Sequence, residues 1–139
     1  MYKIIVDHEA SHADNDIVKE GIITFNEHII GEPRDKEFSI FLKNDSGKIL
    51  GGILANFDTE SVYISIFWID ESLRKQGYGT KLLAAAEQEA IKNGCIFSTT
   101  DTFDFQAEEF YLKNNYERMG EIKNYFYNHS RIFLRKNLK

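Results

Sequence analysis

The sequence has little of the features that would place it in a specialised class of protein. Its 139 residues contain one cysteine, Cys95, which excludes an internal disulfide framework and suits a reducing, cytoplasmic compartment. No apolar run approaches the roughly 20 residues of a membrane span, so no membrane partner is expected. The N-terminus turns acidic early and lacks the basic start and apolar stretch of a secretory signal peptide. These absences predict a globular domain.

Prolines, repeats and linkers are equally scarce. The one proline, Pro33, lies in "GEPRDKE", which predicts a surface loop. No internal repeat and no Pro- or Gly-rich linker marks a domain boundary. A chain of this length buries one hydrophobic core and is too short for two. We therefore expect a single domain over residues 1–139.

The charge balance and the histidines exclude two further classes. The formal net charge is -5 and the pI is about 5.4, which argues against a general nucleic-acid partner. A local basic patch nevertheless occurs at Arg74, Lys75 and Lys81. The four histidines lack metal-ligand spacing and there is no cysteine pair, so no metal site is expected.

Residue periodicity predicts the elements of the first half. "YKIIVDH", residues 2–8, predicts a first strand. Between Ala13 and Ile30 the apolar residues recur at spacings of three and four, which predicts an amphipathic helical region. Gly21 inside that region costs about 1 kcal/mol in a helix, so one helix and two short helices both fit. "EFSIFLKN" and "ILGGILANFD" flank a turn at residues 45–48 and predict a β-hairpin.

The second half alternates strands and helices. "SVYISIFWID" is almost entirely β-branched, aromatic or aliphatic, which predicts a central strand covered on both faces. The apolar spacing from Tyr78 to about Asn93 predicts a helix, and "NG" at 93–94 stops it. "CIFSTT" predicts a short strand with Cys95 in the core, and "FQAEEFYLKNNY" predicts a helix. The residues from Glu117 onward predict two antiparallel strands. The order β-α-β-β-β-α-β-α-β-β indicates an α/β fold (α+β, with a mixed sheet).

The segment "LRKQGYGTKLL" lies between the predicted central strand and the predicted regular helix. A helix N-terminus offers unpaired N–H groups and the positive end of the helix dipole, which together suit a phosphate. Gly77 and Gly79 allow the backbone to approach a ligand closely. The Walker pattern is absent, and Leu82 stands where a Rossmann fingerprint needs its third glycine. The remaining pattern, R-x-x-G-x-G from Arg74, fits a phosphate-binding loop or an ordinary strand-to-helix turn.

Two segments together resemble one known family. "FWIDESLRKQGYGTKLLAAAEQEA" resembles the acetyl-CoA-binding core of the GNAT family of N-acetyltransferases, and "FQAEEFYLKNNYERMG" resembles that family's next segment, F-Y-x-K-x-G-F/Y. The likeness runs from Tyr2 to Leu138 and is strongest to small bacterial stand-alone members. Asn115 stands where the family often has glycine; because asparagine tolerates a left-handed backbone, we expect the helix end to be kept. The resemblance implies a GNAT-like acyl-CoA N-acyltransferase fold, with about six to seven strands in a central mixed sheet and about four helices.

The resemblance also implies an activity. The chain would transfer an acetyl group from acetyl-CoA to a primary amine, most simply of a small molecule, by direct attack in a ternary complex, and it would form a homodimer. Backbone groups of Phe67, Trp68 and Ile69 would contact the pantetheine arm and the acetyl carbonyl. The pyrophosphate would be held by the loop residues Arg74, Lys75, Gln76, Gly77, Tyr78, Gly79 and Thr80.

Tyr111 matches the family's tyrosine near the coenzyme sulfur and would act as the general acid. A phenol with a pKa of about 10 can protonate a thiolate whose thiol ionises at about 8.5. The alternative is that Phe110 and Tyr111 only pack the helix against the sheet. No general base is identified, because Asp101, Asp104 and other acidic residues lie around the relevant strand ends and water serves equally well.

The acceptor pocket is expected from the first helical region, the hairpin and the last strands. Its candidate residues are mostly aromatic: Phe25, Phe38, Trp68, Tyr125, Phe126, Tyr127 and His129. Clustered aromatics beside acidic groups suit a cationic or aromatic amine, and they equally suit a dimer contact. Two other functions stay open, a non-catalytic acyl-CoA-binding or regulatory protein on the same fold and a nucleotide or protein-interaction module.

Overall fold

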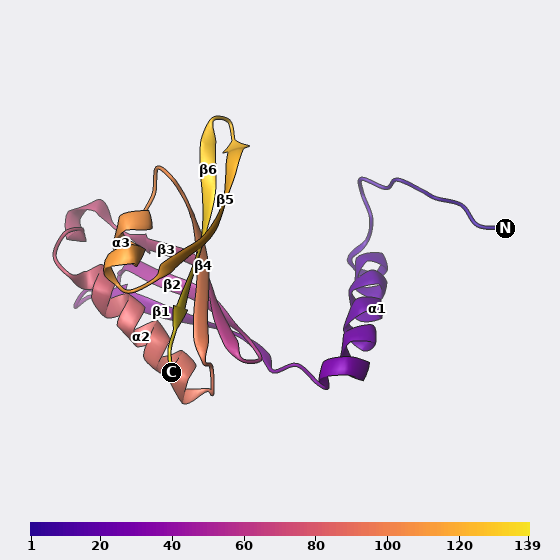
Figure 1. Ribbon diagram of the computed structural model, residues 1–139, viewed down its shortest axis with the longest axis horizontal. Coiled ribbons are helices and arrows are strands. Elements are labelled where there is room, and N and C mark those ends of the chain that lie inside the picture. Colours follow the sequence, from indigo (N-terminus) through magenta and orange to yellow (C-terminus); the bar gives the residue numbers. More distant parts are fainter. The chain divides into compact units, whose positions relative to one another are not determined.

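The computed structural model describes residues 1–139 as two compact units, Met1–Pro33 and Arg34–Lys139. The first unit holds one helix, α1 (His12–Ile30), labelled in Figure 1. Its N-terminus is capped by Ser11, whose Oγ accepts a hydrogen bond from the Asp14 N–H at 3.1 Å. The helix ends at Gly31, which has a φ of 78°. Gly21 does not interrupt α1, so the two-helix alternative is wrong.

The expected first strand is also wrong. Residues 2–8 form no strand. A strand needs a neighbouring edge for its N–H and C=O groups, and α1 is the one regular element of this unit. The local composition is that of a strand, but no partner strand is available within the unit.

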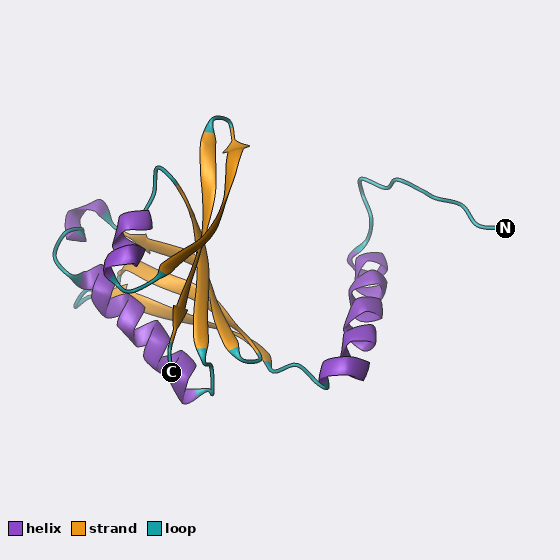
Figure 2. Cartoon of the chain, viewed as in Figure 1, coloured by secondary structure: helices purple, strands orange, loops and turns teal.

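The second unit contains one six-stranded sheet. Its strands are β1 (Asp35–Lys43), β2 (Ile49–Asp58), β3 (Ser61–Ile69), β4 (Phe97–Phe103), β5 (Glu117–Phe126) and β6 (His129–Asn137). They lie in the order β1-β2-β3-β4-β6-β5, and β3–β4 is the parallel pair. Figure 2 draws the strands in orange and the helices in purple. The predicted mixed sheet, its central strand, the hairpin at residues 45–48 and the final antiparallel pair are all confirmed.

Two α-helices accompany this sheet. α2 (Tyr78–Lys92) packs against β1, β2 and β3 through Leu82, Leu83, Ala86 and Ala90, and α3 (Glu108–Lys113) contacts β5. With α1 the chain has three α-helices and one short 3-10 turn, η1 (Glu71–Leu73), which is fewer than the four expected. None of the three helices combines the length and apolar character needed to span a bilayer.

Asn115 has a φ of 71°, so the expected left-handed residue after α3 is confirmed.

The strands β3 and β4 pair over only part of their length. Their register runs from Ser61 opposite Phe97 to Ile64 opposite Thr100 and goes no further. Beyond Ile64, β3 remains paired with β2 but has no partner on its β4 side. The expectation that β3 is covered on both faces is wrong for this half: Ile66 and Trp68 are 56% and 49% exposed. The β2–β3 register shifts at Leu54 and Ala55, which leaves Ser65 as an extra residue in β3, so Ile66 and Trp68 lie on the face opposite the buried Ile64.

The core lies between α2 and the sheet and contains one polar network. Tyr116 donates its hydroxyl hydrogen to Glu87 Oε2 at 3.0 Å, and Ser98 Oγ lies 2.8 Å from the same oxygen. Lys136 Nζ pairs with Glu87 Oε1 at 2.8 Å. Burial raises the pKa of Tyr116 above its ordinary value, so the phenol stays neutral. The network joins α2, β4 and β6 through Tyr116, which directly precedes β5.

We predict that Tyr116→Phe lowers the free energy of unfolding by about 1–3 kcal/mol, because Glu87 Oε2 and the buried Ser98 hydroxyl lose the hydrogen-bond partner that Tyr116 provides. Urea denaturation followed by circular dichroism measures the change. Tyr127→Phe is the matched control, since Tyr127 is 86% exposed, and it should leave the midpoint unchanged. Equal midpoints for all three proteins would show that the network contributes nothing.

Gly52 generates a second stability prediction, because an added Cβ would lie 2.5 Å from the Ile40 carbonyl oxygen of the neighbouring strand. Gly52→Ala must separate β1 from β2 and should cost about 1–3 kcal/mol in the same urea experiment. A Cβ at Gly120 meets no atom within 4 Å, so Gly120→Ala should stay within about 0.5 kcal/mol of the parent. Equal losses at the two positions would contradict the steric explanation.

Candidate functional site

A cleft of about 920 Å³ lies where β3 and β4 stop pairing. Its walls come from four places in the sequence: the second half of β3, the loop and first residues of α2, the end of β4 with the loop after it, and α3. The unpaired edge of β3 therefore faces a cavity and not another strand. An extended ligand can bind such an edge as an added strand would.

The loop before α2 presents free backbone donors to this cleft. Gly77 occupies the N-cap position of α2 with a φ of 86°, and no side chain caps the helix. The first N–H groups of an α-helix have no partner within the helix, so those at the start of α2 can bind an anion. Lys75 also has a left-handed φ, 61°, although it is not a glycine. Gly77, Gly79, Lys75 and Thr80 all line the cleft.

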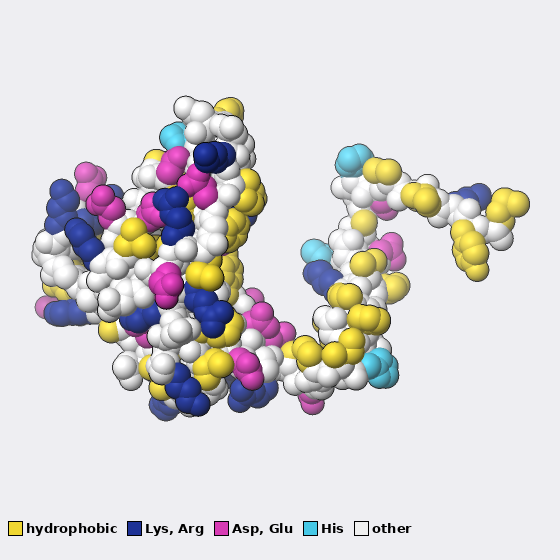
Figure 3. All heavy atoms as spheres, in the orientation of Figure 1, with side chains coloured by type: hydrophobic (Ala, Val, Ile, Leu, Met, Phe, Trp, Pro, Cys, Tyr) yellow, Lys and Arg dark blue, Asp and Glu magenta, His cyan; other side chains and the backbone are white.

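Side-chain bonds within the loop fix its shape. Arg74 Nε donates to the Ile69 carbonyl at 2.9 Å, and Gln76 Nε2 donates to the Ser72 carbonyl at 3.0 Å. Asp70 caps η1 by accepting from the Ser72 N–H at 3.1 Å and from the Ser72 hydroxyl, and these bonds lower the pKa of Asp70. The side chains of Arg74, Gln76 and Asp70 therefore form hydrogen bonds within the loop itself. Lys and Arg side chains gather at this edge of the unit, beside acidic ones (Figure 3).

Gly79 marks a close approach between α2 and α3. A Cβ at this position would lie 3.1 Å from the Phe110 ring and 3.4 Å from Ile69 Cδ1. The Phe110 ring in turn meets Phe67 edge to face at 5.5 Å. The glycine thus lets the start of α2 sit against the aromatic wall of the cleft.

Tyr111 lies at the inner wall of the cleft and is 4% exposed. Its ring meets Phe67 at 6.3 Å and Tyr116 at 5.4 Å. Burial raises the pKa of Tyr111, a hydrogen bond with Thr100 opposes that rise, and the charge of Asp101 adds to it. The phenol is therefore protonated at neutral pH and can donate a proton.

The structure gathers most of the predicted cofactor residues around one cavity. Phe67, Trp68, Ile69, Arg74, Lys75, Gly77, Gly79 and Thr80 line the cleft, whereas Gln76 and Tyr78 do not. Gln76 is engaged with Ser72, as described above, and Lys81 Nζ lies over the Tyr78 ring at 5.6 Å.

The predicted acceptor residues are dispersed. Of these, Trp68 alone lines the cleft. Phe38 stacks on Phe57 at 4.6 Å against the core, and Phe25 lies on α1 in the first unit. Tyr125 and His129 contact the rings of the cleft residues Phe103 and Phe105, at 5.9 Å and 4.7 Å. Phe126 also reaches Phe103, and Tyr127 lies at the exposed turn between β5 and β6.

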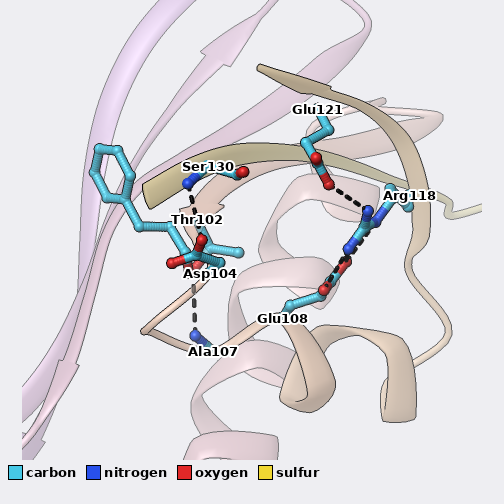
Figure 4. Close-up of polar contacts among 8 residues, drawn as sticks. Thr102, Asp104, Ala107, Glu108, Arg118, Glu121 and Ser130 are labelled. Atoms are coloured by element: carbon cyan, nitrogen blue, oxygen red, sulfur yellow. Dashed lines mark hydrogen bonds and ion pairs between the residues drawn. The ribbon is translucent and has the colours of Figure 1, made fainter. Parts of the chain in front are cut away.

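Sequence reasoning named Asp101 and Asp104 near the strand ends but missed the other residues of the wall formed by β4 and the loop after it. Thr102 Oγ1 accepts from the Ala107 N–H at 3.2 Å, and Asp104 Oδ2 accepts from the Ser130 N–H at 2.9 Å (Figure 4). These bonds hold the loop between β4 and α3. The alternation of buried polar residues at Ser98, Thr100 and Thr102 is the one signal that could have identified this wall.

An ion-pair bridge fixes α3 from its outer side. Arg118 donates to Glu108 through Nε and Nη2 at 2.6 Å, and its Nη1 lies 2.7 Å from Glu121 (Figure 4). The bond to Glu108 raises the pKa of Arg118. The bridge ties α3, which carries Tyr111, to β5.

Comparison with known proteins identifies related chains. The sequence matches the Acetyltransferase (GNAT) family over residues 7–116. An acetyltransferase of Agrobacterium fabrum is 28% identical over 118 residues, which are 85% of this chain and 83% of that protein. A blasticidin-S acetyltransferase of Streptomyces morookaense is 30% identical over 89 residues, 63% of this chain and 65% of that protein.

A solved structure extends the match to the whole fold. The crystal structure of an acetyltransferase from Bacillus cereus superimposes with a TM-score of 0.87 at 32% identity, over 96% of this chain and 97% of that one. Sequence and structure agree, and the chain belongs to the acetyltransferase (GNAT) family.

Proposed function

We propose that this acetyltransferase moves an acetyl group from acetyl-CoA to a primary amine of a small molecule, by direct attack in a ternary complex. One observation carries the proposal: the uncapped N-terminus of α2, the free edge of β3 and the Tyr111 phenol all face the same cleft. A phosphate-binding end, a site for an extended arm and a proton donor are therefore contiguous.

The residues present suit coenzyme A. The N–H groups at the start of α2, with Arg74 and Lys75 beside them, suit the pyrophosphate. The edge of β3 from Phe67 to Ile69 suits the amide groups of the pantetheine arm. Gly79 supports this fit, because the side chain it lacks would meet Phe110 at the cleft wall. When bound, acetyl-CoA supplies the activated thioester.

Tyr111 is proposed as the proton donor. Its buried phenol stays neutral because burial raises its pKa. A neutral phenol next to a departing thiolate can protonate it, and a positioned acid of this kind contributes typically about 10²–10⁴-fold to the rate.

The acceptor is proposed to be a small cationic or aromatic amine. The relative from Streptomyces morookaense is named for blasticidin S, a small molecule. In this chain the cleft offers aromatic surfaces from Trp68, Phe103 and Phe105, which suit a cation. Tyr125, Tyr127 and His129 are proposed to extend this surface beyond the cleft, and a dimer contact at the same residues is the alternative.

Ligand-dependent stability tests the cofactor. Acetyl-CoA and coenzyme A, each at about 100 times its Kd, should stabilise the protein by about 2.7 kcal/mol and raise Tm by several degrees. Differential scanning fluorimetry with ATP and NAD at equal concentrations provides the comparison, and these two should give no shift. Equal shifts with ATP would mean a general nucleotide site, and no shift with either CoA compound would contradict the proposal.

Replacement of the phenol tests the acid. Tyr111→Phe should lower kcat for acetyl transfer about 100-fold while the Kd for acetyl-CoA changes less than about threefold. Release of free thiol measures turnover, and calorimetry measures binding. Tyr116→Phe is the matched control: it keeps the ring that packs against Tyr111 and removes a buried hydroxyl outside the cleft lining, so at 20 °C it should keep its kcat despite its lower stability. Full activity in Tyr111→Phe would show that the phenol only packs.

A further inference from the structure

Asp101 occupies an unusual position on β4. It is the first residue after Thr100, where the pairing of β4 with β3 stops, and it continues to pair with Phe133 on β6. Its carboxylate lines the cleft and is 18% exposed. The charge of Asp101 also contributes to the raised pKa of Tyr111, which places the two groups near one another.

Two hydrogen bonds and one further ion-pair contact orient the Asp101 carboxylate. The Tyr63 hydroxyl donates to Oδ2 at 2.5 Å, and Arg131 contacts both oxygens, with Nε 3.2 Å from Oδ1 and Nη2 3.0 Å from Oδ2. An ionised carboxylate has about four acceptor positions, so these contacts leave acceptor capacity for a donor in the cleft. The carboxylate is therefore held in place and still able to accept.

Arg131 is itself held on several sides. Its Nη1 donates to the Tyr125 hydroxyl at 2.8 Å, and its guanidinium lies over the rings of Tyr125 and Phe133 at 5.0 Å and 5.1 Å. The hydrogen bond to Asp101 raises the pKa of Arg131, so this guanidinium stays charged. The chain Tyr63–Asp101–Arg131–Tyr125 thus fixes the carboxylate from β3, β6 and β5.

Stability alone does not account for this arrangement. Moving two charges out of water costs free energy, and their mutual attraction often does no more than offset that cost. Well-packed apolar residues in the same place commonly give a protein of equal stability. The Asp101 carboxylate lies on a cavity wall, beside an apolar surface that includes Ile66 and Trp68. In this position it can bind a ligand in that cavity.

The charges around the cleft are unevenly distributed. Arg74 and Lys75 line the end next to the N-terminus of α2, whereas Asp101 lines the wall formed by β4. An anionic ligand group suits the first end and a nitrogen bearing N–H donors suits the second.

We infer that Asp101 accepts a hydrogen bond from the nitrogen of the acceptor amine and orients it for attack, and that Tyr63 and Arg131 are positioning residues for this carboxylate. The inference rests on the proposed function. In the reaction the amine lone pair forms the N–C bond and the C–S bond breaks. The nitrogen carries positive charge until it loses a proton to solvent. Tyr111 gives one proton to the departing thiolate and regains one from solvent, so the reaction balances. Asp101 stabilises that transient charge without itself being consumed.

The experiment compares Asp101→Asn, Tyr63→Phe and the parent protein with spermidine, kanamycin and blasticidin S as amine probes. For the amine that the parent acetylates, Asp101→Asn should lower kcat/KM by about 10- to 100-fold, since a charged hydrogen bond is lost. Tyr63→Phe keeps the charge and should lower it less. Calorimetric titration of the amine into protein saturated with coenzyme A should show a comparable loss of affinity. The Kd for acetyl-CoA should stay within about twofold.

Asp58→Asn is the matched control. It makes the same change of charge at the end of β2, outside the cleft lining, and should match the parent in every assay. An Asp101→Asn protein that keeps its parental Tm, kcat/KM and amine affinity would overturn the assignment. So would an equal loss of acetyl-CoA and amine affinity, because that pattern indicates a structural role. A parent protein that acetylates none of the probes and binds no acetyl-CoA would instead overturn the proposed function, and the assignment of Asp101 with it.

Discussion

The early end of the β3–β4 ladder is the constraint on which the site depends. Four residue pairs join these parallel strands, and after Ile64 and Thr100 each strand continues with its other neighbour only. A continuous ladder would have satisfied the backbone of β3 from Phe67 to Ile69 and closed the cavity. Because it stops, a strand edge is left free inside the sheet, where both sides are walled by protein. Edges of this kind are normally found at the margin of a sheet and are a hazard there.

The remaining parts of the site are arranged around that gap. The loop after β3 turns the chain so that the start of α2 faces the open edge: Gly77 adopts the left-handed φ of this turn, and Gly79 lacks the side chain that would meet Phe110. α3 closes the other side and carries Tyr111, and the Arg118 bridge fixes it to β5. Each element thus contributes one chemical capacity: anion binding from α2, backbone pairing from β3, and proton donation from α3.

Much of this could be predicted from local sequence. The glycine loop, the helix after it, the hairpin and the left-handed Asn115 follow from spacing and residue type, which act over a few positions. The prediction of a strand at residues 2–8 was wrong because strand pairing depends on two segments, whereas the composition of residues 2–8 describes only one of them. The exposure of Ile66 and Trp68 was missed for the same reason, since it depends on the register shift between β2 and β3. The Tyr63–Asp101–Arg131 contacts required the strand order β3-β4-β6, which the sequence does not contain.

The short ladder between β3 and β4 also divides the sheet into two halves, and we call this boundary the seam. β1, β2 and β3 are joined by hairpins and packed by α2, while β5 and β6 form another hairpin next to β4 and α3. The four residue pairs of β3 with β4 are the backbone connection between these halves. Contacts close in sequence form cooperative units readily, and long-range pairings between such units open at lower free energy. A ligand lying in the cleft touches both halves at once. Its binding therefore slows amide hydrogen exchange along β3 and β4 well beyond the residues in contact, because it opposes separation of the seam.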